Sequence, residues 1–198
     1  LDSVAAHPGV TGAYYAMASD GTLAYVPLAN FTLPTAQIPM EFVGRDGKVE
    51  PVRLPKGVMA RFSPDGRRLV YVRWGPKGND VFTYDLERKV EQRLTGDEGD
   101  EYWPIFTPDG RRVVYNSNRG GRKFVTLDWR AADGSGAPDS LVTGRSHQQA
   151  AGWAAGGTEL LYTAGPNDST SMDIWILPMS GSRTPRPLMR SRNLETHP

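Results

Sequence analysis

The sequence predicts an all-β fold: a β-propeller of four-stranded antiparallel blades, with about four blades in this chain. A turn-closing glycine recurs at residues 21, 66, 110 and 157, at intervals of 45, 44 and 47 residues. A period in the forties is typical of propeller blades and of some helical repeats. Within each repeat the side chains alternate with a period of two, as in "RRLVYVRW" (67–74), and no stretch shows a capped helical pattern. The alternation favours the propeller.

The turn inside each repeat has a chemical reason. The stretch "RFSPDGRRLVYVRW" (61–74) is repeated as "IFTPDGRRVVYNSN" (105–118). Proline presets φ at the second position of the turn, and aspartate is well suited to the third position. Glycine then takes the left-handed conformation that closes a hairpin. The fourth copy, "AAGGTELLYT" (154–163), lacks the proline and the aspartate but keeps Gly157, whose steric freedom the turn needs most.

The chain is expected to form a single propeller domain, and its elements follow in order. The blades are predicted at about 13–54, 58–95, 102–143 and 149–189, and residues 190–198 start a next blade or close the ring. The stretch "DLERKVEQRL" (85–94) is interpreted as strand, tight turn and strand. The predicted strands are 13–18, 22–26, 40–45 and 49–54; 58–63, 67–74, 80–86 and 90–95; 102–107, 111–117, 123–130 and 139–143; and 149–154, 158–164, 172–178 and 186–189.

Four blades make a partial ring, or a ring that a second copy completes. A single four-stranded sheet cannot bury both faces, so neighbouring blades must stack. The two end blades then leave strand edges and apolar faces without a neighbour. One hypothesis is therefore a homo-oligomer that forms through the open blade edges. "ETHP" (195–198) is in register with "EYWP" (101–104), which places the start of a fifth innermost strand at the end of the chain.

Composition excludes several classes of partner. The 23 basic and 22 acidic residues leave a net charge of +1, so no nucleic-acid partner is expected. No apolar run approaches the roughly 20 residues of a membrane-spanning helix. The first ten residues do not read as a signal peptide, and a chain that starts at Leu1 is expected to come from a longer one. The absence of cysteine excludes disulfides and thiolate metal sites.

Four phrases carry a resemblance to a known family. "RFSPDGRRLVYV", "NDVFTYDLERKVEQRLT", "WPIFTPDGRRVVYNSNRGG" and "MDIWILPMSGSRTPRPLM" resemble the TolB-like (WD40-like) propeller repeats, which occur in TolB and in the extracytoplasmic regions of some bacterial serine/threonine kinases. The resemblance covers the chain from about residue 13 onwards. It implies a non-catalytic scaffold that binds a protein partner or a small ligand, without a cofactor, in a periplasmic or other extracytoplasmic location.

A second hypothesis is a metal-dependent hydrolase, such as a lactonase or esterase, that acts in the central channel. The innermost strand of each blade lines this channel, and calcium needs six to eight oxygen ligands there. The alternative for the same positions is a polar, water-filled channel. The metal-ligand candidates are Glu101, Glu195 and His197, and the ligand or channel candidates are Glu101, Trp103, Gln148, Glu195, His197 and Tyr14.

Other motifs favour structural roles. Ser146 and His147 are adjacent, so their side chains point opposite ways on an extended segment, and no catalytic residue is predicted. The glycine-rich "NRGGRK" (118–123) lies between two strands, which predicts a hairpin turn with solvated arginines; the alternative is an anion-binding rim. Phe82 and Trp175 occupy matching positions and are expected to pack between sheets. Trp74 and Trp129 lie near strand ends, where half-exposed side chains would suit a partner surface.

Overall fold

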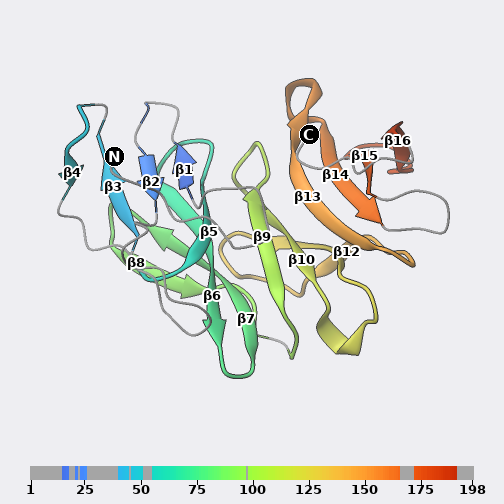
Figure 1. Cartoon of the computed structure of the whole chain (residues 1–198), viewed down its shortest axis with the longest axis horizontal. Coiled ribbons are helices and arrows are strands. Elements are labelled where there is room, and N and C mark those ends of the chain that lie inside the picture. The colour runs from blue at the N-terminus through green and yellow to red at the C-terminus, as the bar shows by residue number, and fades with distance from the viewer. Residues whose placement is uncertain are drawn as a thin grey trace.

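The computed structural model describes residues 15–17, 21, 23–25, 40–44, 46–50, 55–96, 98–165 and 172–190. These residues form four antiparallel sheets of four strands each, which are the blades of a β-propeller (Figure 1). Within every sheet the strands pair in chain order. The predicted fold class is confirmed, and no α-helix occurs in the described part of the chain. Nor does that part contain a helix long and apolar enough to cross a membrane.

The described strands are arranged in four successive sheets. The sheets follow one another from left to right in Figure 1. Their strands are β1 (Tyr15–Met17), β2 (Leu23–Tyr25), β3 (Glu41–Val43) and β4 (Val49–Glu50); β5 (Val58–Phe62), β6 (Arg68–Gly75), β7 (Gly78–Asp85) and β8 (Val90–Arg93); β9 (Glu101–Phe106), β10 (Arg112–Ser117), β11 (Thr126–Ala131) and β12 (Asp139–Val142); β13 (His147–Ala154), β14 (Glu159–Gly165), β15 (Asp173–Pro178) and β16 (Arg186–Met189).

The first strand of each blade lies at the centre of the assembly. Strand β5 contacts β1 and β9, and β9 contacts β13, so the four first strands form a common hub. At the outer edge, every residue of β8 and of β16 is exposed. The second strands β6 and β10 are the most buried, between the partly buried inner strands and the exposed outer ones, as expected when blades stack face to face around a centre.

Successive side chains of β6 pack alternately into two hydrophobic cores, one on each face of the sheet. Four consecutive residues of β6, 69–72, are fully buried. Leu69 and Tyr71 pack with the first blade, whereas Val70 packs with Val113 and Tyr115 of the third. Phe82 stacks on Tyr71. Because neighbouring blades cover both faces of this strand, its sequence is a continuous apolar run and does not alternate between apolar and polar residues.

The repeated turns stack on each other across the blades. Arg68 of the second blade donates to the carbonyl of Gly110 in the third (2.6 Å). A Cβ atom added at Gly157 would lie 2.7 Å from two carbon atoms of Pro108. Gly110 and Gly157 therefore face the turn of the previous blade as well as adopting a positive φ, whereas an added Cβ at Gly66 would meet no atom within 4 Å. Both constraints explain why the fourth turn keeps its glycine.

Three predicted strand starts need correction. The third strand of blade two was expected from residue 80, but β7 begins at Gly78. The third strand of blade three was expected from residue 123, but β11 begins at Thr126. The preceding residues form a short 3₁₀ turn, η2 (Arg119–Gly121), in which two successive glycines have φ near 70°. The first strand of blade four begins earlier than expected, at His147, because the N–H of Gln148 pairs with the carbonyl of Val125 in blade three (2.8 Å). The domain limits, including the role of residues 191–198 outside the described part, stay a prediction.

Candidate functional site

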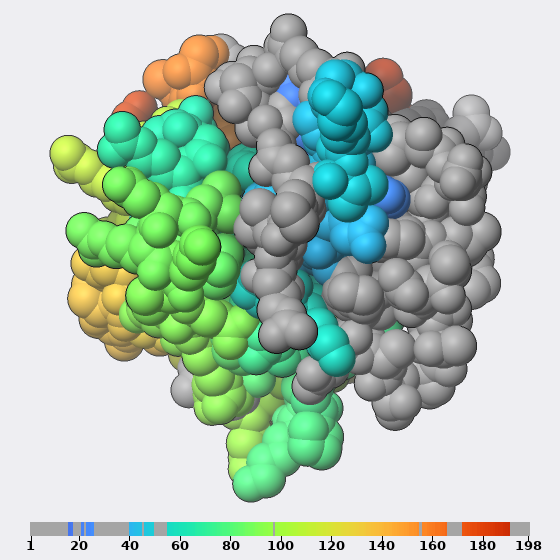
Figure 2. All heavy atoms as spheres, turned by 90° about the vertical axis from the view of Figure 1, so that its left-hand side faces the viewer, coloured from blue at the N-terminus to red at the C-terminus, as the bar shows by residue number. Residues whose placement is uncertain are grey.

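One end of the propeller gathers the hairpins between second and third strands and the loops that lead into the next blade. We call it the loop face and define it by residues 75–78, 98–101, 118–125 and 144–147. In Figure 1 the 75–78 hairpin and η2 lie along the lower side, whereas the DG turns lie along the upper side. Figure 2 shows the hairpin between β6 and β7 projecting at the bottom of the molecule. Loops held on a rigid frame are the usual place for recognition.

A hollow of about 510 Å³ opens on the loop face and is lined by Glu98, Arg119, Gly120 and Arg122. Its volume lies within the range of small-ligand sites, roughly 300–1,000 Å³. The hollow belongs to the "NRGGRK" turn, where the sequence predicted solvated arginines. The structure corrects that expectation, because the side chains of Arg119 and Arg122 are only 28% and 27% exposed and both are paired.

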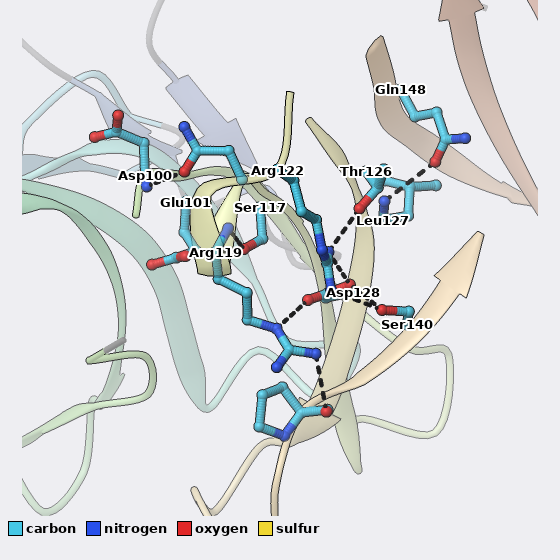
Figure 3. A network of polar contacts seen from close by, with 12 residues as sticks. Asp100, Glu101, Ser117, Arg119, Arg122, Thr126, Leu127, Asp128, Ser140 and Gln148 are labelled. Carbon is cyan, nitrogen blue, oxygen red and sulfur yellow. Dashed lines mark hydrogen bonds and ion pairs between the residues drawn. The ribbon is translucent and has the colours of Figure 1, made fainter. Parts of the chain in front are cut away.

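The two arginines converge on one fully buried carboxylate, Asp128 (Figure 3). Arg119 donates from Nε to one Asp128 oxygen (2.6 Å), and Arg122 donates from Nη1 to the other (2.9 Å). Arg122 also donates to Thr126 Oγ1 (2.7 Å) and to Ser140 Oγ (2.9 Å), and Ser140 in turn donates to Asp128 (2.9 Å). A buried charge is tolerated only when it is paired and hydrogen-bonded in this way.

Sequence reasoning did not find Asp128, although a signal exists. Asp128 pairs across the sheet with Tyr115, as Phe82 pairs with Tyr71 and Trp175 pairs with Tyr162. The third blade thus has an acid at the position where its neighbours have an aromatic ring. Each of the two rings stacks on its cross-strand partner within its own sheet, Phe82 on Tyr71 and Trp175 on Tyr162. Both rings also lie against core clusters to which two neighbouring blades contribute.

A second set of hydrogen bonds fixes the loops around the hollow. Asp100 accepts from the backbone and side-chain amides of Asn79 (3.0 and 2.9 Å), which join the second blade to the third. The N–H of Asp100 donates to Asn118 Oδ1 (2.6 Å) at the start of the turn. A Cβ at Gly99 would lie 2.8 Å from the same amide oxygen, so the close approach requires glycine. Burial, aided by the Asp100 carboxylate, raises the pKa of Tyr102, whose hydroxyl accepts from Asn79 (2.6 Å).

The predicted channel residues divide into two groups. Glu101 is 1% exposed and accepts from Ser117 Oγ (3.0 Å). Gln148 is 4% exposed, and its Oε1 accepts from the N–H of Leu127 (3.2 Å), which ties blade four to blade three. Trp103 is half-buried and tilts against Tyr102. The other three candidates, Tyr14, Glu195 and His197, lie outside the described residues, so neither the channel set nor the metal set is tested.

Trp103 marks an irregularity that recurs between blades. It has a φ of 46°, and Met59, at the matching position of blade two, has a φ of 56°. Both lie where the first strand shifts register against the second, which is a β-bulge opposite Tyr115 and Tyr71 respectively. Positive φ is uncommon for bulky residues, so the strain is maintained by the surrounding packing at the hub.

No group of three or more histidine, aspartate or glutamate side chains suited to a metal ion occurs among the described residues. His147 is exposed, and its Nδ1 accepts from the N–H of Val125 (3.2 Å). Its ring lies edge-on to Phe124. The Ser146–His147 pair, which the sequence already disfavoured as a catalytic dyad, therefore uses its imidazole to bridge blades three and four.

No family model matches the sequence. An uncharacterized protein of Agrobacterium fabrum is 37% identical over 75 residues, which are 37% of this chain and 25% of that protein. Dipeptidyl-peptidase 5 of Porphyromonas gingivalis is 34% identical over 65 residues, 30% of this chain and 10% of that protein. These matches cover a quarter or less of the relatives' length.

Solved structures resemble nearly the whole chain. TolB from Acinetobacter baumannii has a TM-score of 0.71 at 21% identity over 90% of this chain and 43% of its own. A TolB candidate from Agrobacterium tumefaciens has a TM-score of 0.71 at 19% identity over 89% of this chain and 64% of its own. An oligogalacturonate lyase in complex with manganese has a TM-score of 0.60 at 12% identity, covering 89% and 52%. At these identities the likeness establishes the propeller fold alone.

Proposed function

We propose that this chain is a non-catalytic, TolB-like propeller scaffold whose loop face binds a protein partner. The observation that carries the proposal is the hollow at residues 98 and 119–122, together with the buried Asp128 that holds both of its arginines. Two arginines placed by a buried carboxylate are ordered before any partner arrives. Binding then costs less side-chain entropy, and a preorganised surface gains affinity for that reason.

Several features make the loop face a platform rather than a set of separate loops. Asp100 and Asn79 join the second blade to the third, and His147 joins the third to the fourth. Lys77, Lys123 and Arg145 are exposed cations of the loop face. Arginine is enriched at protein interfaces and at the residues that contribute most to their affinity. A small anionic ligand is the alternative occupant that the same groups would accept.

Site-specific photo-cross-linking in the cells that make the protein tests the proposal. A photoreactive amino acid replaces Lys77, Lys123 or Arg145 on the loop face, and Arg67 or Arg111 on the opposite face as matched controls. All five side chains are exposed, so each substitution should leave the fold intact. We expect one discrete cross-linked protein from the loop-face positions and none from the controls. Equal labelling from both faces, or none from either, would contradict the proposal.

A second candidate function is the metal-dependent hydrolase of the channel. The observation that favours it is Glu101, a buried carboxylate at the hub, and one solved propeller of similar fold holds manganese. Residues 195 and 197 would have to supply the remaining ligands. Hydrolysis of lactones and esters with and without EDTA, and in Glu101→Gln, tests this function. Activity that depends on both the metal and the carboxylate would replace our first proposal.

Two further expectations remain proposals. The resemblance to TolB-like repeats supports a periplasmic or other extracytoplasmic location, which fractionation of the source cells would test. The exposed outer strands β8 and β16 leave sheet edges for a second copy. Light scattering that gives a stable monomer at all concentrations would remove the homo-oligomer.

A further inference from the structure

The donors left over in the hollow are arranged for a carboxylate. A guanidinium carries five N–H donors. Arg122 uses both Nη1 donors on Thr126 and Asp128 and one Nη2 donor on Ser140. The donors that remain, Nε–H and one Nη2–H, are available for one planar acceptor. A planar fork of this kind matches the two oxygens of a carboxylate.

The charges around the hollow favour an anion with one negative charge over an anion with two. Arg119 and Arg122 carry two positive charges, and the buried Asp128 cancels one of them. Glu98 lines the same hollow and repels any anion that enters. Counted together, the two guanidinium groups and the carboxylates of Asp128 and Glu98 sum to zero. A carboxylate, with one negative charge, therefore meets less repulsion from Glu98 than a phosphate dianion does.

The glycine turn beside the two arginines leaves space for a ligand, and Gly120 itself lines the hollow. Gly120 and Gly121 have φ values of 69° and 70°, and an added Cβ at either glycine would meet no atom within 4 Å. Open space therefore lies above the turn, while the turn itself requires residues that tolerate the left-handed conformation. A ligand chain can approach the arginines without displacing a side chain of the turn.

We propose that this hollow binds an acidic segment of the protein partner, through an aspartate or glutamate side chain or a C-terminal carboxylate. The proposal rests on the loop-face function above and names the chemistry of the partner. Arg122 supplies the bidentate contact to the carboxylate, and the turn at 120–121 leaves room for the segment to approach. Glu98 lowers the affinity for any acidic group, so only a correctly placed acidic segment binds.

The test titrates the full chain with fluorescein-labelled hexaglutamate and follows fluorescence anisotropy. We expect saturable binding, a loss of about tenfold or more in Arg122→Gln, and a gain of about threefold in Glu98→Gln. Arg111→Gln is the matched control, because Arg111 is an exposed arginine of the same blade on the opposite face and does not line the hollow. It should change affinity by about twofold or less. Glu98→Gln breaks none of the ion pairs with Asp128, so it keeps the test decisive if Arg122→Gln misfolds.

Competition by unlabelled probes assigns the chemistry. Hexaglutamate and glutarate should displace the labelled probe, whereas hexaglutamine should not. Displacement by inorganic phosphate at lower concentration than by glutarate would overturn the carboxylate assignment, as would equal losses in Arg122→Gln and Arg111→Gln. If the loop face cross-links a partner but hexaglutamate does not bind, this inference fails and the proposed function stands. If hexaglutamate binds but no loop-face cross-link forms, the proposed function fails, and the hollow is a site for a free carboxylate rather than for a partner.

Discussion

Replacing Asp128 by asparagine should show how much the buried carboxylate stabilises the third blade. The side chain is fully buried and accepts three hydrogen bonds, from Arg119, Arg122 and Ser140. Asparagine has nearly the same shape, but it removes the charge and turns one acceptor into a donor that faces a guanidinium. The substitution therefore changes the electrostatics and leaves the packing almost unaltered.

The expected loss follows from the geometry. Removing one partner of a fully buried ion pair costs about 3–5 kcal/mol. Both arginines are about a quarter exposed, so water can solvate them in part, and we reduce the expected loss to about 2–3 kcal/mol. For a chain of this size the midpoint of thermal unfolding should fall by about 5–10 °C.

Urea unfolding followed by tryptophan fluorescence measures this loss directly. Asp139→Asn is the control, since Asp139 is an exposed carboxylate on the neighbouring strand β12, and it should cost about 0.5 kcal/mol or less. The double variant with Arg122→Gln should cost less than the sum of the single variants, because the two substitutions remove the same contact. A loss in Asp128→Asn no greater than in the control would refute the role given to the buried carboxylate.

Three further outcomes are expected. The Thr107 hydroxyl and a backbone N–H lower the pKa of Asp109 from its ordinary 3.8. The stability that Asp109 contributes is therefore present above pH 3.8 and is lost as the pH falls through the lower pKa of the folded state. In urea unfolding, the free energy of unfolding should differ less between pH 7 and pH 3 in Asp109→Asn than in the wild type. Gly157→Ala should lower the melting midpoint more than Gly156→Ala, since both have a positive φ but only the former meets the proline of the previous turn; equal shifts would contradict the stacking of turns. The Arg112 guanidinium lies 4.1 Å from the centre of the Trp129 ring, so Arg112→Gln should cost about 1 kcal/mol in urea unfolding, and an unchanged free energy of unfolding would show that the contact is unimportant.

Local chemistry carried most of the fold prediction. The "PDG" turns placed the hairpins at Gly66 and Gly110, and the period of two placed the strands between them, because turn conformation and strand alternation depend on neighbours in sequence. The errors fell where a tertiary contact decides. Strand β13 begins at His147 because the backbone of Gln148 pairs with blade three. The sequence around residue 147 gives no sign of this contact.

The candidate site shows the same division. The sequence singled out the turn at 118–123 and offered an anion-binding rim as an alternative, but it expected solvated arginines there. Asp128 lies outside the turn, and its pairing with Arg119 and Arg122 appears only when β11 stands beside η2. The sequence by itself determined the turns, the strands and the repeat length of the blades, because these depend on steric preferences between residues close together in the chain. Only the tertiary structure of the third blade decided which charges are buried together, because desolvation and ion pairing depend on η2, β11 and β12 lying side by side.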